Sequence, residues 1–318
     1  MQVAITARNF TTHSDAPLRL LTQAGLSCQD HSLDRFGVGT SEETMIQTIG
    51  NAEALICGLE PVSERVLTSC PKLRYVSRRG IGYDNIDVQA CHRLGITVCR
   101  TLGAVEGAVA EHVLAYILYF SRRLDLQNRS MHEGHWDRLM APGAKGRTLG
   151  LVGFGGIGKE IARRARPFGM NILYTCRHPR AEWESEYGVR YADLDALLSQ
   201  SDYVSVNVPL TEESRGMFNA GRFAAMKSGA VFINIARSPV MVVDDLVSAL
   251  KSGHLGGAAV DVFPYEPCTD SPLRALDNVL LTPHTASYTQ ENHVEMNLTA
   301  SRNLLSMLDG TINSQCLL

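Results

Sequence analysis

Three polar residues of complementary chemistry follow three short apolar runs in the second half of the sequence. Arg237 comes after AVFINIA, Glu266 after AAVDVF and His284 after VLLTP. Runs of this length and composition predict buried strands of a parallel sheet. Because ligands of such sheets bind outside the carboxyl ends of the strands, we expect the three side chains to converge on one crevice.

The chemistry of these groups suits the reduction of a 2-keto acid. The guanidinium of Arg237 is able to hold a carboxylate through two parallel hydrogen bonds. The imidazole of His284 exchanges a proton near neutral pH, so it is suited to protonate a carbonyl as a hydride arrives. A carboxylate at Glu266 would orient the imidazole and favour its protonated form. Asp261, at the end of the strand before Glu266, is a further candidate beside the hydride donor.

A glycine-rich loop predicts the source of that hydride. The segment GFGGIG at 153–158 fits the pattern G-x-G-x-x-G and stands between the strand LGLV and a helical stretch. Gly153 allows a tight turn, Gly155 lets the backbone approach a pyrophosphate, and Gly158 lets the helix pack close to the strand. The first helical turn adds N–H groups and a positive dipole end. This setting predicts a nicotinamide dinucleotide cofactor.

The end of the next strand favours NADP(H) over NAD(H). The acidic residue that binds the ribose of NAD is expected about 20 positions after the loop, at or next to Cys176, but no carboxylate occurs before Glu182. Arg177 stands there instead, with His178 and Arg180 close by in the sequence. A guanidinium binds a 2′-phosphate, which a carboxylate would repel. The alternative is that these are solvated loop charges and that NAD(H) is used.

Two successive β-α-β series must position these groups. In the first hundred residues, helical patterns at 62–68 and 86–93, the latter opened by Asp84 and Asn85, alternate with strand-like runs. The predicted strands of the first series are 3–6, 54–57, 73–76 and 96–99, and those of the second are 149–152, 171–175, 203–208, 230–235, 258–263 and 279–281. The pattern predicts an α/β protein with two Rossmann-like domains, each a doubly wound parallel sheet.

Two longer helical patterns complete the chain. The stretch 104–123 is apolar on most sides and must be buried, either in a subunit interface or in the core of its own domain. The stretch 291–308 has one apolar face.

Composition excludes several classes of protein. The 318 residues are 45% hydrophobic and 20% charged, with net charge −3 and no basic run, so neither nucleic acid nor a membrane surface is expected as a partner. The longest apolar run, at 113–120, is too short to span a bilayer, and the N-terminus does not resemble a signal peptide. The eight cysteines form no C-x-x-C pair. We therefore expect a cytoplasmic protein with reduced thiols and no metal site.

Segments along nearly the whole chain resemble the D-isomer-specific 2-hydroxyacid dehydrogenase family, which includes 3-phosphoglycerate dehydrogenase and glyoxylate/hydroxypyruvate reductase. The matching segments are SRRGIGYDNID at 77–87, AVAEH at 108–112, TLGLVGFGGIGKEIA at 148–162, VPLTEESRGMFN at 208–219, FINIARSPVMVVDDL at 232–246, AAVDVFPYEP at 258–267 and NVLLTPHTAS at 278–287.

The resemblance implies roles for individual residues. Arg237 binds the carboxylate and carbonyl of the substrate, and Glu266 pairs with His284, the acid/base. A substrate loop falls on Arg78, Arg79, Gly80, Ile81 and Gly82, whose backbone amides hold the carboxylate. The expected cofactor contacts are Gly153, Gly155, Gly156, Ile157, Gly158, Cys176, Arg177, Val208, Pro209, Ala236, Asp261 and Ser287.

The resemblance also implies an organisation of the chain. A discontinuous, flavodoxin-like substrate domain covers 1–99 and 286–318, and a dinucleotide-binding domain covers 100–285. A homodimer with the helix at 104–123 in the interface is expected. The chain departs from the usual family pattern at Cys176, Asn207 and Ser238.

The substrate is expected to be a small, unphosphorylated 2-keto acid such as glyoxylate or hydroxypyruvate. Arg78, Arg79 and Arg138 are available to bind a phosphate, as in 3-phosphoglycerate dehydrogenase, the alternative activity. However, the loop after the strand 54–57 offers Glu60, which would repel a phosphate.

Two rival interpretations lie outside the favoured activity. A dinucleotide-sensing corepressor of the C-terminal-binding-protein type is disfavoured because the Arg, Glu and His set is intact. The same Glu266–His284 pair argues against a formate dehydrogenase, although not against phosphite oxidation.

Overall fold

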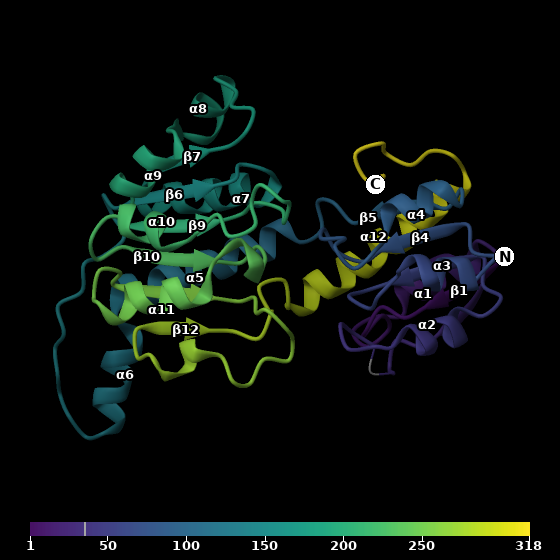
Figure 1. The fold of residues 1–318 in the computed structure, drawn as a ribbon, viewed down its shortest axis with the longest axis horizontal. Coiled ribbons are helices and arrows are strands. Elements are labelled where there is room, and N and C mark those ends of the chain that lie inside the picture. The colour runs from purple at the N-terminus through teal and green to yellow at the C-terminus, as the bar shows by residue number, and fades with distance from the viewer. Residues whose placement is uncertain (35) are drawn as a thin grey trace. The chain divides into compact units, whose positions relative to one another are not determined.

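The computed structural model describes residues 1–34 and 36–318, and the chain divides into two compact units. Unit 1 comprises Met1–Val105 and Tyr288–Leu318, and unit 2 comprises Glu106–Ser287. The sequence-based boundaries, after residues 99 and 285, lie a few positions before these divisions. Each unit is a parallel sheet covered by helices (Figure 1), which confirms the predicted fold class.

The sheet of unit 1, in the part that the structure describes, has five parallel strands in the order β2-β1-β3-β4-β5. This is the strand order of the flavodoxin-like fold, with its crevice at the carboxyl ends of β1 and β3. The strands are β1 (Gln2–Ile5), β2 (Ser27–Asp30), β3 (Ala54–Cys57), β4 (Tyr75–Arg78) and β5 (Thr97–Arg100).

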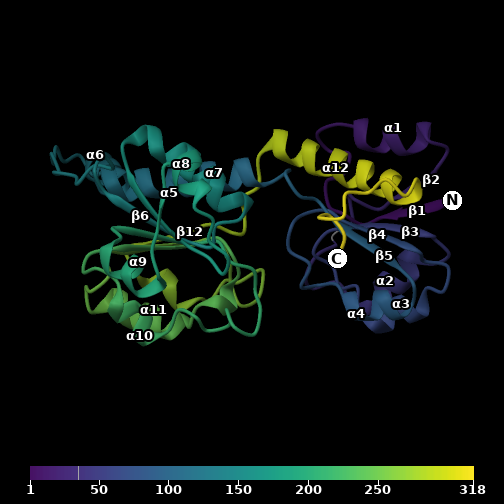
Figure 2. The same ribbon diagram turned by 90° about the horizontal axis from the view of Figure 1, so that it is seen from above.

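Helices cover both faces of this sheet. Figure 2 shows α1 and α12 on one face and α2, α3 and α4 on the other, and a separate apolar cluster lies on each face. The C-terminal helix α12 packs on the sheet, where the Ser77 hydroxyl donates to the carbonyl of Ala300 at 2.8 Å. The helices are α1 (Ala16–Gln23), α2 (Glu42–Ile49), α3 (Glu64–Ser69), α4 (Val88–Arg93) and α12 (Gln290–Leu308).

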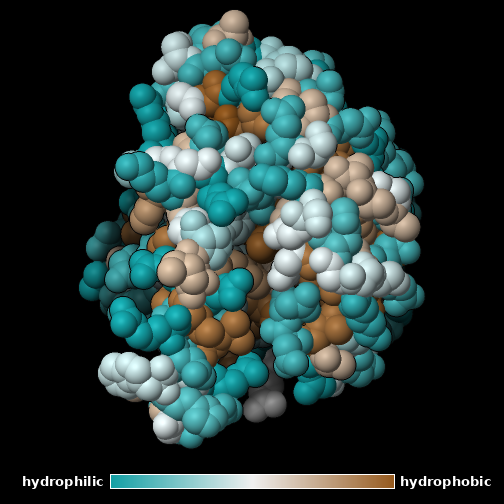
Figure 3. Space-filling view, turned by 90° about the vertical axis from the view of Figure 1, so that its left-hand side faces the viewer, coloured by the Kyte–Doolittle hydropathy of each residue, from teal (hydrophilic) through white to brown (hydrophobic). Residues whose placement is uncertain are grey.

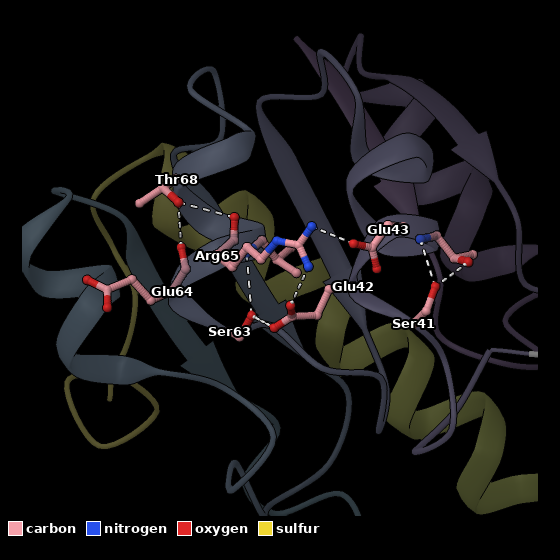
Figure 4. Close-up of polar contacts among 9 residues, drawn as sticks. Ser41, Glu42, Glu43, Ser63, Glu64, Arg65 and Thr68 are labelled. Atoms are coloured by element: carbon pink, nitrogen blue, oxygen red, sulfur yellow. Dashed lines mark hydrogen bonds and ion pairs between the residues drawn. The ribbon is translucent and has the colours of Figure 1, made fainter.

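Serine caps begin two neighbouring helices of unit 1. The Ser41 hydroxyl accepts a hydrogen bond from the Thr44 N–H at 3.1 Å, and the Ser63 hydroxyl accepts one from the Val66 N–H at 3.4 Å (Figure 4). Each cap satisfies an N–H group that has no partner inside its helix, and such caps stabilise by about 1 kcal/mol. Arg65 pairs with carboxylates on α2, but it lies on the surface, where ion pairs contribute little.

Unit 1 differs from the sequence prediction at three points. The strand predicted at 73–76 is observed at β4, two residues later, because Leu73 belongs to a turn in which its N–H bonds to the carbonyl of Cys70. The edge strand β2 is mostly polar and exposed, so it carries no apolar pattern. Asp87 caps α4 rather than Asp84 or Asn85; its carboxylate accepts from the Ala90 N–H at 2.8 Å.

The sheet of unit 2 has seven parallel strands in the order β12-β11-β10-β9-β6-β7-β8. The order reverses between β6 and β9, as in a dinucleotide-binding sheet. The strands are β6 (Thr148–Val152), β7 (Asn171–Thr175), β8 (Arg190–Tyr191), β9 (Tyr203–Val206), β10 (Val231–Asn234), β11 (Gly257–Val260) and β12 (Val279–Leu281).

The helices of unit 2 also lie on both faces. Figure 2 shows α5, α7 and α8 on one face and α9, α10 and α11 on the other. The main helices are α5 (Glu106–Arg122), α6 (Leu124–His132), α7 (Gly156–Ala165), α8 (Glu182–Tyr187), α9 (Leu194–Gln200), α10 (Ala220–Ala225) and α11 (Val243–Lys251). Across residues 1–34 and 36–318, no helix is both long and apolar enough to cross a membrane.

Unit 2 contains one strand that the sequence did not predict. The two-residue strand β8 is exposed at the edge of the sheet and too short for a periodic pattern.

The helix α5 has mostly buried apolar side chains, but Glu111, Ala115 and Arg122 are exposed along it. Burial of these exposed positions in a subunit interface stays a prediction.

Candidate active site

The glycine-rich loop joins β6 to α7 and requires glycine at two of its positions. Gly153 has a φ of +97°, and a Cβ atom there would lie 2.7 Å from the carbonyl oxygen of Asn207. A Cβ atom on Gly158 would lie 2.6 Å from the carbonyl oxygen of Gly153. The first glycine therefore makes the turn and the second brings α7 against it, as the sequence pattern predicts.

The loop also leaves room for a phosphate. No described atom lies within 4 Å of a Cβ atom built on Gly155, the residue that precedes α7. The N–H of Lys159 is the first of the helix to bond back, to the Gly155 carbonyl at 3.0 Å. The N–H groups of Gly156, Ile157 and Gly158 thus remain for a ligand, because the first turn of a helix has no internal acceptors. A pyrophosphate fits this arrangement.

The segment after β7 presents a thiol and exposed basic groups. Burial raises the pKa of Cys176 above its usual value, so the side chain is neutral at the position where a carboxylate was expected. Arg177, His178 and Arg180 are exposed, and no ion pair of Arg177 occurs within the described ranges. Lys159 on α7, which the sequence analysis did not single out, lies 4.3 Å from the centre of the Trp183 ring and acts electrostatically on Cys176.

The structure brings Arg237, Glu266 and His284 together at one edge of the unit 2 sheet. They follow β10, β11 and β12, which are adjacent strands. Glu266 Oε2 and His284 Nδ1 are 2.7 Å apart, and Glu266 Oε1 accepts the Phe263 N–H at 3.1 Å. Arg237 donates to the carbonyl of Ala236 at 2.8 Å and acts electrostatically on Glu266. A carboxylate on Nδ1 leaves Nε2 of the imidazole for a substrate.

Glu266 is a charged partner for the imidazole. Burial alone would raise the pKa of Glu266, but the hydrogen bond and charge of His284, the Phe263 N–H and the charge of Arg237 together lower it below its usual value. The carboxylate is therefore ionised at neutral pH and holds the His284 ring at Nδ1 through a charge-assisted hydrogen bond.

Asp261 holds the backbone next to His284, and its expected place beside the cofactor stays a prediction. Its carboxylate is 1% exposed and accepts the N–H groups of Thr285 and Ala286 at 2.8 and 2.9 Å. These bonds hold the backbone on the C-terminal side of His284, whose φ is +55°. A non-glycine residue is seldom left-handed, and such strain persists only where the surroundings enforce it. Asp261 therefore fixes the turn that carries the imidazole.

The predicted substrate loop lies in unit 1 and begins at Arg78, the last residue of β4; the surroundings of its residues differ. Arg78 is buried and its guanidinium bonds to the carbonyl of Arg79. A Cβ atom on Gly80, whose φ is +127°, would collide with that guanidinium. The Gly80 N–H is taken by Thr101 at 2.6 Å, whereas those of Ile81 and Gly82 have no acceptor among the residues described. Arg78 and Gly80 therefore shape the loop, and the next two amides are the ones available to an anion.

Buried basic groups without partners lie close to this loop. Nε and Nη2 of Arg79 and both ring nitrogens of His293, in the first turn of α12, are buried without a hydrogen bond to any described residue. Burial, the charge of Arg79 and that of His13 lower the pKa of His293 to about 4. Glu60 is also buried, and its Oε1 accepts from the Gly58 N–H at 2.8 Å and from the Thr6 hydroxyl. The sequence analysis missed His293, which carries no motif.

The remaining expected contacts are spread over unit 2. Val208 and Pro209 follow β9 beside the Gly153 turn, and Ala236 precedes Arg237. Ser287 is the last residue of the unit. Arg138 is exposed on the segment between α6 and β6. In the described part of the chain, no cluster of three or more His, Cys, Asp or Glu side chains is arranged to hold a metal ion.

An unobstructed helix start with unpaired N–H groups and a Glu–His pair lie at the carboxyl edge of one sheet. This combination defines a dinucleotide-dependent oxidoreductase.

The family model of the D-isomer specific 2-hydroxyacid dehydrogenase NAD binding domain matches residues 114–286. The glyoxylate/hydroxypyruvate reductase B of Escherichia fergusonii is 39% identical over 281 residues, 86% of this chain and 87% of the relative. The glyoxylate reductase of Pyrococcus furiosus is 38% identical, covering 85% and 83%.

Among solved structures, the TT0316 protein from Thermus thermophilus matches with a TM-score of 0.87 and 31% identity, over 99% of each chain. The chain therefore belongs to the D-isomer specific 2-hydroxyacid dehydrogenase family. It is an enzyme that transfers a hydride between a nicotinamide dinucleotide and a small 2-keto or 2-hydroxy acid, as the sequence predicted.

Proposed function

We propose that this enzyme reduces glyoxylate, hydroxypyruvate or a close relative to the D-2-hydroxy acid, with NADPH as the preferred cofactor. The observation that carries the proposal is the Glu266–His284 pair beside Arg237, on the same sheet edge as the dinucleotide loop. The names of the relatives, glyoxylate/hydroxypyruvate reductase B and glyoxylate reductase, support this substrate class.

In this mechanism, Arg237 holds the carboxylate and carbonyl oxygen of the substrate through two parallel hydrogen bonds. The bound dinucleotide supplies the hydride. The imidazolium of His284 gives its Nε2 proton to the carbonyl oxygen as negative charge develops there. Glu266 keeps the imidazole oriented for that step through the hydrogen bond to Nδ1. In oxidation, the neutral imidazole accepts the proton.

An initial-rate panel tests the proposal. Glyoxylate, hydroxypyruvate, pyruvate, formate and phosphite are each assayed with the appropriate redox form of both cofactors. We expect reduction of glyoxylate and hydroxypyruvate with NADPH. A lack of turnover with every 2-keto acid, while the cofactor still binds, would instead favour a dinucleotide-sensing protein.

The preference for NADPH depends on Arg177. Arg177→Gln is expected to raise KM for NADPH by about 10- to 100-fold, because a charge-assisted hydrogen bond contributes about 1.5–3 kcal/mol. KM for NADH should change little, since NADH has no 2′-phosphate. The matched control is Arg190→Gln on β8, which bonds Gln200 at 3.2 Å. A wild-type enzyme that uses NADH as well as NADPH would contradict the preference.

The pH dependence of reduction tests the role of Glu266. Its lowered pKa keeps the carboxylate charged through the neutral range. Glu266→Gln removes that charge and weakens the hydrogen bond that orients His284, so kcat/KM for reduction is expected to fall about tenfold or more at neutral pH, and the decline on the acid side caused by protonation of Glu266 is expected to disappear. The exposed Glu213→Gln serves as the control. Superimposable pH profiles of wild type and Glu266→Gln would remove Glu266 from this role.

A second candidate substrate is a 2-keto acid with a further acid group, such as the 3-phosphate of hydroxypyruvate. Two unpartnered N–H groups of Arg79 and the single N–H of the neutral His293 ring favour it, because buried donors without acceptors are costly and a bound anion would satisfy them. The Glu60 carboxylate opposes it, because only Oε1 is bonded, to Gly58 and Thr6, and Oε2 is buried without a partner among the described residues. A higher kcat/KM for the phosphorylated acid than for hydroxypyruvate would decide for this candidate.

A cytoplasmic homodimer remains part of the proposal. Support comes from apolar side chains on the segment after α6, where Trp136 is 78% and Met140 88% exposed. Figure 3 shows hydrophobic surface, in brown, on the side of the molecule that faces its viewer. Burying such side chains against a second copy would remove them from water. Sedimentation velocity of the pure protein distinguishes a dimer from a monomer.

A further inference from the structure

Four side chains form a continuous hydrogen-bonded row from the middle of α5 to the turn that carries His284. His112 Nε2 lies 2.8 Å from the hydroxyl of Tyr116, one helical turn further along, and also makes a longer contact of 3.4 Å to the Thr282 hydroxyl. The Tyr116 hydroxyl contacts the Thr282 hydroxyl, which donates to Asp261 Oδ1 at 2.5 Å. Thr282 follows β12 and Asp261 follows β11, so the row joins three elements of unit 2.

The chemistry of the groups fixes the direction of every proton in the row. A carboxylate accepts only, so the Thr282 hydroxyl must donate to Asp261. Its single proton is then used, and the Tyr116 hydroxyl must donate to Thr282. Tyr116 in turn accepts from His112, which therefore carries a proton on Nε2. A row in which each bond polarises the next in the same direction is stronger than its separate bonds.

Asp261, at one end of the row, is hydrogen-bonded to the turn that carries His284. The same carboxylate that receives the Thr282 proton accepts the N–H groups of Thr285 and Ala286. The N–H of His284 itself bonds to the carbonyl of Thr282 at 3.0 Å. Thr282 thus joins the left-handed backbone of His284 to the row at two points, through its carbonyl and through its hydroxyl.

We propose that Tyr116, backed by His112, is a positioning residue for His284 and acts through Thr282 and Asp261. It contacts no reacting atom in this proposal; it orients the Thr282 hydroxyl and the Asp261 carboxylate, which hold the turn in its strained conformation. The proposal rests on the acid/base role of His284 proposed above.

The row is built to stay in one protonation state. Tyr116 is 2% exposed, and burial raises its pKa above the usual value for a phenol. Burial also lowers the pKa of His112, although the charge of Asp261 opposes that effect. Tyr116 therefore keeps its proton, and His112 does not need a second one, so the direction of the row is constant across the neutral range.

The same helix offers a matched pair of variants. Tyr116→Phe removes the hydroxyl that bridges His112 and Thr282 and keeps the ring. Tyr119→Phe, three residues on, removes a hydroxyl that acts on Asp125 and not on Asp261. We expect Tyr116→Phe to lower kcat for reduction about tenfold or more, because a 1.4 kcal/mol loss is tenfold in rate, while the Kd of NADPH and the activity of Tyr119→Phe change less than about twofold.

A deuterium isotope effect with NADPH labelled at the transferred position separates positioning from partial unfolding. Slower proton and hydride transfer in Tyr116→Phe should make the isotope effect on kcat larger. A smaller fraction of folded enzyme would lower kcat and leave the isotope effect unchanged, which would overturn the proposal. Thr282→Val should behave like Tyr116→Phe, and Thr282→Ser, which restores the hydroxyl, should recover most of the rate.

Hydrogen exchange tests the row without any turnover. The amides of Thr285 and Ala286 should exchange faster in Tyr116→Phe and Thr282→Val than in wild type or Tyr119→Phe, because Asp261 then holds them less firmly. Unchanged exchange at these amides would refute the positioning role. If the exchange rates rise but no 2-keto acid is reduced by wild type, the proposed function fails and the positioning of the turn stands.

Discussion

Replacing His284 with alanine is expected to lower kcat for reduction by about 10²- to 10⁴-fold and to leave the Kd of NADPH nearly unchanged. The side chain lies 2.7 Å from a carboxylate that is charged at neutral pH, and its backbone is held in a left-handed conformation. That geometry occupies Nδ1 of the imidazole with Glu266 and leaves Nε2 as the nitrogen that exchanges the proton. Loss of the proton donor leaves only water to protonate the developing alkoxide.

The measurement is single-turnover reduction at several pH values, with cofactor binding followed separately by fluorescence. His132→Ala, an exposed histidine on α6, is the control. A His284→Ala enzyme with the kcat of wild type would remove this residue from the chemistry. A variant that no longer binds NADPH would show instead that the turn serves the cofactor.

Replacing Arg237 with methionine is expected to lower kcat/KM by about a hundredfold or more. Removing one member of a desolvated charge pair costs about 2–5 kcal/mol, and each 1.4 kcal/mol is tenfold. Arg237 lies three residues after β10, and its own carbonyl accepts a hydrogen bond from the Asn234 side-chain amide at 3.1 Å. The guanidinium therefore starts from a rigid backbone, and its loss removes binding of the carboxylate in the transition state.

Two further variants separate the effect of charge and geometry at Arg237 from the general effect of losing an arginine. Arg237→Lys keeps the charge but loses the two-pronged geometry, so its kcat/KM should lie between those of wild type and Arg237→Met. Arg222→Met on α10, whose guanidinium pairs with Asp195, controls for the loss of a surface arginine. Equal kcat/KM values for Arg237→Met and wild type would contradict the proposed role.

The fold was largely predictable because its buried strands have a strong local signal. β3, β9, β10 and β11 are short apolar runs followed by loops, and each is buried throughout. The strands that escaped prediction, β2 and β8, lie at sheet edges, where half the backbone and most side chains face water. Such strands form because the adjacent strand of the sheet offers backbone hydrogen bonds. The residues of the edge strand itself show no pattern that predicts this pairing.

Part of the site was also predictable. The sequence by itself determined the dinucleotide loop, since Gly153 and Gly158 are needed for a turn and a helix contact that are local in the chain. It also determined that Arg237, Glu266 and His284 lie at strand ends, because parallel strands bring their carboxyl ends to one edge of a sheet.

Only the tertiary structure decided which hydrogen-bond partner each polar side chain of the site has. Asp261 and Glu266 are five residues apart after the same strand, yet one accepts backbone amides and the other the imidazole. Arg78 turns inward to its own loop, while two nitrogens of the neighbouring Arg79 are left without partners among the described residues. These choices depend on hydrogen-bond partners that are distant in sequence, such as Thr282 for Asp261. Residue type and spacing carry no information about those partners, because they meet only when the sheet and its helices have packed.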